Sequence, residues 1–309
     1  MTVMTAEQLA ARSRRAVAAA LEVARGLGLP VEHGEVLHDV FSVVVHLTPV
    51  PVVARIQVVV PPGLSPHERL RRQQRELDVV AWLDQQGVAV VAPSPLVPRF
   101  PVVHNGFGMT FWDLADVSDD HTPYAGYGVQ RTAQLNAALV NYPDPLPFLA
   151  PFNTGTAEML AQLTAADLLT ADDLSRARTE YDALHEVLRD DASFRARFPA
   201  VDVQPIHGDG PSHNMIQTHG GLLFSDFEDI TCGPVEWDLA MLGPESNADY
   251  DAAAVSLGLR ATDPRVQLTM DRARTLQFIG CVALIPELPI LSEGLAPTIA
   301  AWRSSPAFA

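Results

Sequence analysis

Residues 206–240, IHGDGPSHNMIQTHGGLLFSDFEDITCGPVEWDLA, are the segment around which we expect the rest of the chain to be organised. A short apolar run ends at Ile206 and leads into a histidine-glycine-aspartate triplet whose aspartate is Asp209. Asn214, a neutral oxygen donor, stands five residues after this aspartate, and Asp226 lies further along in the segment SDFED. Carboxylate and amide oxygens at such short spacings favour a site that binds a hard cation and accepts a proton.

A turn in the middle of this stretch is expected to bring two of the polar residues together. Residues 215–218 and 222–224 are typical of short strands, and the two glycines within 219–221 supply the positive φ that a tight hairpin needs. A hairpin centred near Gly220 pairs residues whose numbers sum to about 440, which places Asn214 opposite Asp226. Mg²⁺ takes one or two protein oxygens and leaves its other positions to water and phosphates, so this pair predicts a magnesium site.

Asp209 lies upstream of the hairpin, where it is free to orient an acceptor hydroxyl and take its proton. A base, a metal-holding asparagine and a metal-holding aspartate are the parts of a phosphoryl-transfer site. The order HGDxxxxN, strand, SDFED and PVEWDLA resembles the aminoglycoside phosphotransferase and choline kinase group, within the protein-kinase-like fold. The resemblance implies that Asp209 is the catalytic base, that Asn214 and Asp226 hold Mg²⁺, and that Asp238 is a structural anchor.

The same resemblance implies an α+β, bilobal fold. Residues 1–112 are then an amino-terminal antiparallel-sheet lobe that binds nucleotide and ends in a hinge, and residues 113–309 are a mainly helical lobe for catalysis and acceptor binding. The local patterns in the first part predict helices over 5–25 and 65–83, three strands within 31–60, a short strand over 88–92 and a hairpin over 99–112. In the second part they predict helices over 129–140, 156–163, 171–189, 265–284 and 291–302.

The nucleotide-binding residues are expected in the first lobe. Arg55 stands in the third strand, where the resemblance implies a basic residue on the α- and β-phosphates, and Glu76 of the next helix is placed to pair with it. A solvent-facing arginine on an amphipathic strand is the alternative. The chain contains no lysine, so arginine must fill any such role. The loop 39–42 that is expected over the phosphates has no glycine, and Ser42 is its hydroxyl donor.

The segment GMTFWDL resembles the hinge between the lobes of these enzymes. The resemblance implies that its backbone bonds adenine and that the side chains of Met109, Phe111 and Trp112 flank the base. Packing in the core also explains these three apolar residues.

Composition excludes several classes of protein. The net charge of −16 argues against nucleic-acid binding, which requires cations on the protein. The chain has no apolar run of membrane-spanning length and no export signal at its start, so we expect a cytoplasmic protein. Cys232 and Cys281 are too few for a disulfide framework and are expected as reduced thiols.

Three functional hypotheses remain open from the sequence. The first is a Mg²⁺- and ATP- or GTP-dependent kinase for a small-molecule hydroxyl acceptor, with an amine-bearing acceptor such as an aminoglycoside favoured by the acidic charge. The second is a pseudokinase that binds nucleotide or a partner without turnover, which the missing glycines and lysine favour. The third is a metal-dependent hydrolase that uses His207, His213 and His219. These histidines lack a compact ligand spacing, and His207 is better interpreted as a structural residue that braces the catalytic loop.

Overall fold

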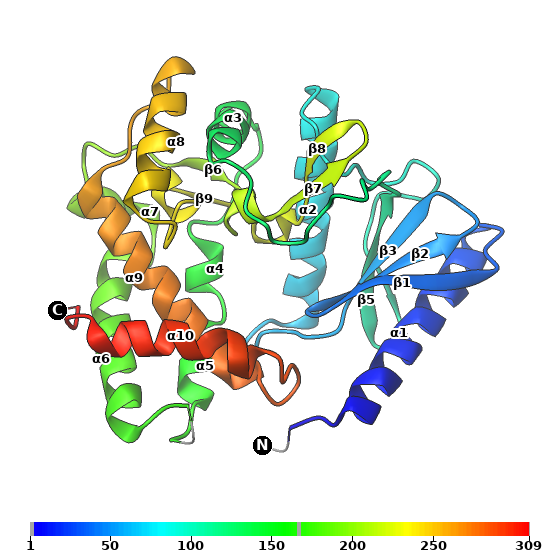
Figure 1. Cartoon of the computed structure of the whole chain (residues 1–309), viewed down its shortest axis with the longest axis horizontal. Helices are drawn as coiled ribbons and strands as arrows, with labels where there is room; N and C mark the ends of the chain where they lie inside the picture. Colours follow the sequence, from blue (N-terminus) through cyan, green and yellow to red (C-terminus); the bar gives the residue numbers. More distant parts are fainter. Residues whose placement is uncertain (1–2, 166–167, 309) are drawn as a thin grey trace. The chain divides into compact units, whose positions relative to one another are not determined.

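The computed structural model describes residues 3–165 and 168–308, and these form two compact units (Figure 1). The first unit contains the chain up to His121 together with Gln217–Leu223 and Leu284–Pro289. The second contains Thr122–Ile216, Phe224–Ala283 and the residues from Ile290 onward. The first unit therefore continues past residue 112, where the sequence places the end of the first lobe.

An antiparallel sheet forms the centre of the first unit, as predicted. Its strands lie in the order β1-β2-β3-β5-β4. Their bounds are His33–Asp39 for β1, Ser42–Thr48 for β2, Val52–Gln57 for β3, Val102–His104 for β4 and Phe107–Asp113 for β5. The strand predicted over 88–92 does not form. Pro93, which follows it, makes only an isolated bridge to Trp112, because proline has no N–H to extend a ladder.

Helices α1 (Ala6–Gly26) and α2 (Pro66–Gln85) pack on opposite faces of this sheet. Both begin with the predicted capping box, in which a hydroxyl and an acidic or amide side chain three residues apart satisfy the first backbone N–H groups. A stripe of buried alanines lets α1 lie close to the core residues Val43 and Ile56. The opposite face carries Arg55, which is bonded to Glu76 of α2.

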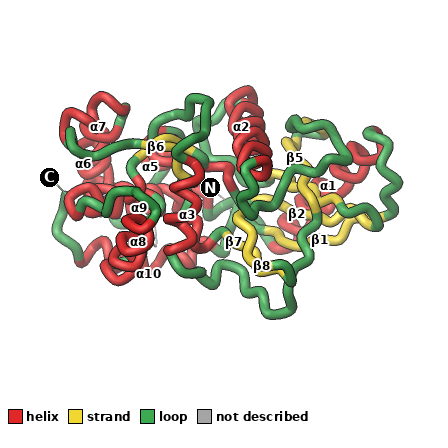
Figure 2. The backbone as a smooth tube through the Cα atoms, turned by 90° about the horizontal axis from the view of Figure 1, so that it is seen from above, coloured by secondary structure: helices red, strands yellow, loops and turns green. Residues whose placement is uncertain are grey.

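The second unit is mainly helical, as predicted, and its helices are drawn in red in Figure 2. They are α3 (Gln130–Leu139), α4 (Ala150–Asn153), α5 (Thr156–Gln162), α6 (Ala171–Leu188), α7 (Asp191–Arg197), α8 (Pro244–Ser256), α9 (Pro264–Gly280) and α10 (Leu291–Ser304). All five predicted helices form, although α9 ends at Gly280 and continues as a 3₁₀ turn over Cys281–Leu284. The sequence patterns did not predict α4, α7 or α8. Helix α8 buries only Tyr250 and Ala254, so its sequence has no clear apolar stripe.

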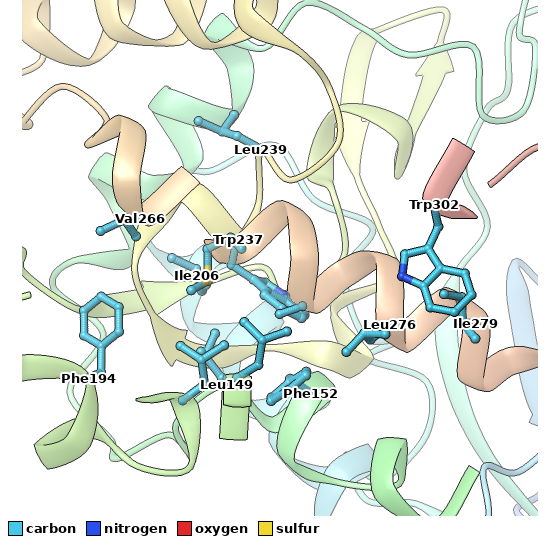
Figure 3. Packing of buried hydrophobic residues seen from close by; sticks show 14 of the residues in the cluster. Leu149, Phe152, Phe194, Ile206, Trp237, Leu239, Val266, Leu276, Ile279 and Trp302 are labelled. Atoms are coloured by element: carbon cyan, nitrogen blue, oxygen red, sulfur yellow. The ribbon is translucent and has the colours of Figure 1, made fainter. Parts of the chain in front are cut away.

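Helix α9 runs through the core of the second unit. Its residues Val266, Leu276 and Ile279 point into the apolar cluster that Figure 3 shows around Trp237 and Phe152. The rings of Trp237 and Phe152 meet edge to face at 6.5 Å. Removing a buried tryptophan side chain typically costs about 3–5 kcal/mol of the free energy of unfolding, so this cluster fixes α9 firmly. The part of α9 beside Trp237 is thereby held in place next to the segment that follows Ile206.

Four short strands carry the stretch 206–240. Strands β6 (Gln204–Ile206) and β9 (Thr231–Gly233) pair antiparallel, and β7 (Met215–Thr218) and β8 (Gly221–Phe224) form the predicted hairpin. The hairpin register is one residue away from the prediction. The Thr218 hydroxyl accepts the N–H of Gly220 at 3.2 Å and donates to the carbonyl of Gly221 at 2.6 Å, which closes a two-residue turn. Ser225, and not Asp226, therefore stands opposite Asn214.

Among the residues that the structure describes, no helix is long and apolar enough to cross a membrane. Cys232 and Cys281 are free thiols, as predicted.

Candidate active site

A buried carboxylate holds the loop that follows β6. Asp238 lies almost without solvent exposure and accepts the backbone N–H of His207 at 3.1 Å and that of Gly208 at 2.8 Å, one on each oxygen. Burial raises the pKa of the Asp238 carboxyl, and the hydrogen bonds from the two N–H groups oppose this shift. These contacts are the ones that a structural anchor makes, because they tie the loop to the segment 234–239.

His207 joins the same loop to the end of the hairpin. Its ring is fully buried against Phe227, with the ring centroids 4.6 Å apart. Nδ1 accepts the N–H of Asp209 at 3.3 Å, and Nε2 faces the carbonyl of Ser225 at 2.9 Å. This pattern assigns a neutral ring with its proton on Nε2. Both ring nitrogens are therefore engaged in bracing the loop, which counts against a hydrolase that uses His207 as a metal ligand.

Gly208 is required by the shape of the loop. Its φ is +92°, and a Cβ atom at this position would overlap the carbonyl oxygen of Asp229. The carbonyl oxygen of Gly208 accepts two side-chain donors, Nε1 of Trp237 at 2.7 Å and Nη2 of Arg274 at 2.8 Å. The backbone just before Asp209 is consequently fixed from both its N–H and its carbonyl side.

The carboxylate of Asp209 is oriented by two donors and remains open to solvent. Oδ1 accepts Nη1 of Arg274 at 3.3 Å, and Oδ2 accepts Nδ2 of Asn214 at 3.3 Å. The same Nδ2 also donates to the backbone carbonyl of Asp209. The side chain is nevertheless 46% exposed. An ionised carboxylate has about four acceptor positions, so it retains capacity to bind a hydroxyl from outside.

Asn214 and Asp226 lie at the open end of the hairpin. The backbone carbonyl of Asn214 accepts the N–H of Ser225 at 2.9 Å and its hydroxyl at 3.1 Å, and Asp226 is the next residue. Because Nδ2 of Asn214 donates to Asp209, the amide oxygen is the atom that is suited to bind a cation. Asp226 adopts the left-handed conformation, with φ of 61°, which is costly for a residue other than glycine and typical of functional sites. An amide oxygen and a carboxylate oxygen fit Mg²⁺ that also binds phosphates and water.

Arg274 of α9 is a site residue that the sequence analysis did not identify. It is buried, it lies 65 residues after Asp209 in the chain, and its guanidinium carbon stands 4.3 Å from the centre of the Trp237 ring. It also donates to Oε1 of Gln277 at 3.0 Å. The sequence contained no signal for this contact, since an arginine within a helical pattern does not reveal which distant loop it faces.

The predicted pair between Arg55 and Glu76 forms in the first unit. Nη1 of Arg55 lies 2.9 Å and 3.0 Å from the two carboxylate oxygens of Glu76. Glu76 is buried and the Arg55 side chain is only 16% exposed, so the alternative of a solvent-facing arginine is wrong. Ser42 begins β2 and is itself buried, directly after the turn that closes β1 onto β2.

The predicted adenine-binding side chains divide between the two faces of the sheet. Arg55 pairs with Thr110 across β3 and β5, and Nε1 of Trp112 donates to the Thr110 hydroxyl at 2.9 Å, so Trp112 shares the face of Arg55. Met109 and Phe111 point to the opposite face, where they are buried in the core beneath α1. Successive side chains of a strand alternate between faces, and core packing therefore accounts for Met109 and Phe111.

The antiparallel sheet, the mainly helical second unit and the loop built on Asp209 together define a kinase-like phosphotransferase. The chain belongs to the phosphotransferase enzyme family (APH), which residues 34–273 match. No curated protein matches the chain.

Solved structures with a similar fold include small-molecule kinases. A microcompartment-associated aminopropanol kinase has a TM-score of 0.61 and 16% identity, with 92% of this chain and 94% of that chain covered. A choline kinase from Streptococcus pneumoniae has a TM-score of 0.56 and 14% identity, with 91% and 98% covered. An amicoumacin kinase in complex with AMP-PNP, Ca²⁺ and Ami has a TM-score of 0.57 and 13% identity, with 96% and 95% covered. At these identities the likeness concerns the fold.

Proposed function

We propose that this chain transfers the γ-phosphoryl group of ATP or GTP to a hydroxyl of a small molecule. The observation that carries the proposal is the carboxylate of Asp209, which is held at both oxygens and yet is half open to solvent. The carboxylate therefore keeps acceptor positions that an incoming hydroxyl can reach.

In the proposed reaction Asp209 binds the acceptor hydroxyl and takes its proton. The hydroxyl oxygen forms a bond to the γ-phosphorus, and the bond from that phosphorus to the β,γ-bridging oxygen breaks. The nucleoside diphosphate leaves with the electron pair of the broken bond. His207 and Asp238 hold the loop, so that the carboxylate needs little reorganisation when the acceptor arrives.

Asn214 and Asp226 are the residues proposed to hold Mg²⁺, which when bound would neutralise charge on the β- and γ-phosphates. Arg55, steadied by Glu76, is proposed to contact the α- and β-phosphates. Its guanidinium offers a planar set of donors that suits phosphate oxygens, so it fills the role of the lysine that this chain lacks.

Ser42 and Trp112 stay proposed nucleotide contacts, because the strands that carry them place both on the Arg55 face of the sheet. For the acceptor we propose a hydroxylated molecule that bears an amine. The solved kinases of similar fold include an aminopropanol kinase and a choline kinase, and the net charge of −16 attracts cations.

The test is release of ADP and of the phosphorylated product across a panel of amino alcohols, aminoglycosides, sugars and macrolides. We expect turnover with at least one amine-bearing alcohol. Asp209→Asn should keep nucleotide affinity and lose about 10²- to 10⁴-fold in kcat, the usual contribution of a general base. Efficient transfer to a neutral sugar with inert amines would refute the amine-bearing acceptor alone. Undiminished turnover in Asp209→Asn would refute the mechanism.

The pseudokinase alternative predicts nucleotide binding without turnover in the same panel. The geometry of the loop favours an enzyme, because Asp209, Asn214 and Asp226 are all present and the first is oriented by buried donors.

A further inference from the structure

Arg274 combines deep burial with a permanent charge. Only 4% of this residue of α9 is exposed, and a buried charge is stable only when it is paired and hydrogen-bonded. Its guanidinium donates to three oxygens, the carbonyl of Gly208 at 2.8 Å, Oδ1 of Asp209 at 3.3 Å and Oε1 of Gln277 at 3.0 Å. The flat face of the group stacks on Trp237. Hydrogen bonds around its edge and the indole ring on its face thus fix the position of the guanidinium.

Two of these three oxygens belong to the loop that carries the proposed base. The Gly208 carbonyl is shared with Trp237, and the Asp209 carboxylate is shared with Asn214, which approaches from the hairpin. The carboxylate is therefore held between α9 on one oxygen and the hairpin on the other. A side chain that is 46% exposed would otherwise rotate among its rotamers.

We propose that Arg274 is a positioning residue for phosphoryl transfer, which holds the Asp209 carboxylate at the angle where it takes the proton of the acceptor hydroxyl. The inference rests on the proposed function, since it gives Asp209 the part of the base. A displacement of reacting groups by 1 Å costs about 10²-fold in rate, so loss of this contact should act on turnover more than on binding.

Only a guanidinium satisfies this position. The three acceptors lie in different directions, and a planar fork reaches them together while one face remains on the indole ring. An ammonium group is a single point charge that cannot make the same set of bonds. Arg274→Lys should therefore retain the charge beside Asp209 and lose the orientation.

Arg176 of α6 offers a matched control in the same unit. Its guanidinium carbon lies 4.5 Å from the centre of the Trp302 ring, it pairs with Glu180 at 2.8 Å, and it donates to the carbonyl of Ser305 at 3.0 Å. The kinds of contact are those of Arg274, namely an indole face, a carboxylate and a backbone carbonyl. None of these contacts involves the loop of Asp209.

The kinetic experiment compares Arg274→Gln, Arg274→Lys and Arg176→Gln in the full chain. Arg274→Gln should lower kcat by about 10- to 100-fold and leave the KM for ATP unchanged, with Arg274→Lys between it and the wild type. Arg176→Gln should lower the melting temperature to a similar extent and keep kcat. In an Asp209→Asn background, Arg274→Gln should cause no further loss. Equal kcat values in Arg274→Gln and Arg176→Gln, or a fully additive loss in the double variant, would overturn the proposal.

Hydrogen exchange provides a readout that does not depend on turnover. Peptides that cover residues 206–214 should exchange several-fold faster in Arg274→Gln and Arg274→Lys than in the wild type, and at the wild-type rate in Arg176→Gln. If the wild type transfers phosphoryl groups to no acceptor and not to water, the proposed function fails, and exchange still decides whether Arg274 holds the loop. Unchanged exchange in both Arg274 variants would overturn the positioning role.

Discussion

Replacing Asp238 by asparagine tests how the site is held. In the wild type each carboxylate oxygen accepts one buried backbone N–H, from His207 at 3.1 Å and from Gly208 at 2.8 Å. Asparagine offers a single acceptor oxygen, so its amide group must face one of these N–H donors. A buried donor left without a partner costs about 1–3 kcal/mol, and the free energy of unfolding should fall by that amount. Asp238→Ala leaves both donors without partners and should cost about twice as much.

The assay combines thermal unfolding with measurement of kcat. The melting temperature of Asp238→Asn should fall by roughly 2–10 °C. The kcat value should fall as well, because a shift of the His207 and Gly208 backbone moves the next residue, the proposed base Asp209. Asp251→Asn is the control, since Asp251 also accepts two hydrogen bonds, both from Thr262, and lies away from the loop. One of those donors is the Thr262 hydroxyl, which can instead accept a hydrogen bond from the new amide group. The melting temperature of Asp251→Asn should therefore fall less than that of Asp238→Asn. If Asp238→Asn and Asp251→Asn had the same melting temperature and both kept the wild-type kcat, the anchoring argument would be wrong.

Four further results are expected. Asp226→Ala should abolish the Mg²⁺ dependence of ATP binding in calorimetry, and equal wild-type affinity with and without Mg²⁺ would contradict the metal assignment. Arg55→Ala should raise the KM for ATP more than Arg55→Lys does, and a double-mutant cycle with Glu76→Gln should show coupling rather than additivity. The hydrogen bonds from Arg303 hold the pKa of Asp173 well below its usual range. The ionised carboxylate therefore stabilises the folded state fully above about pH 4, and this contribution to the free energy of unfolding is lost as the pH falls further. In Arg303→Gln, the free energy of unfolding should fall less between about pH 4 and lower pH than it does in the wild type. Finally, the KM for an amine-bearing acceptor should rise with ionic strength, whereas a neutral acceptor should show no such rise.

Local chemistry made much of the fold predictable. The capping boxes at Thr5 and Ser65 depend on residues three positions apart, and the turn at Asn105 requires only that both of its central residues adopt positive φ. The contact between Arg55 and Glu76 was also predictable, because the resemblance implied which strand and which helix face each other. The capping boxes and the turn, unlike this contact, need no knowledge of distant parts of the chain.

Two features that depend on tertiary packing and one that depends on a side chain within a turn were missed. Helix α9 is buried on nearly all sides, so its sequence has no polar face from which the direction of Arg274 follows. The hairpin register differed by one residue because the Thr218 side chain closes the turn, an interaction that the glycine pattern does not include. Met109 and Phe111 were assigned to adenine by resemblance, and the pairing of β3 with β5 instead turns them into the core. A contact remote from the motif decides the first and third cases, whereas the register depends on a side chain within the turn itself.

The acidic residues of the second unit bear on acceptor recognition in a way that composition alone does not reveal. Many of them are already engaged in local structure, with Asp190 capping α7, Asp191 paired with Arg195, Asp251 bonded to Thr262 and Asp173 paired with Arg303. A carboxylate that serves a helix end or an ion pair is not at the same time a dedicated subsite for an amine. The net charge therefore acts on a cationic acceptor at long range, through a field that salt screens over roughly 10 Å at 0.1 M. Under the proposed function, attraction of this kind would raise the rate of encounter with the acceptor, and the oriented carboxylate of Asp209 would select the reacting hydroxyl.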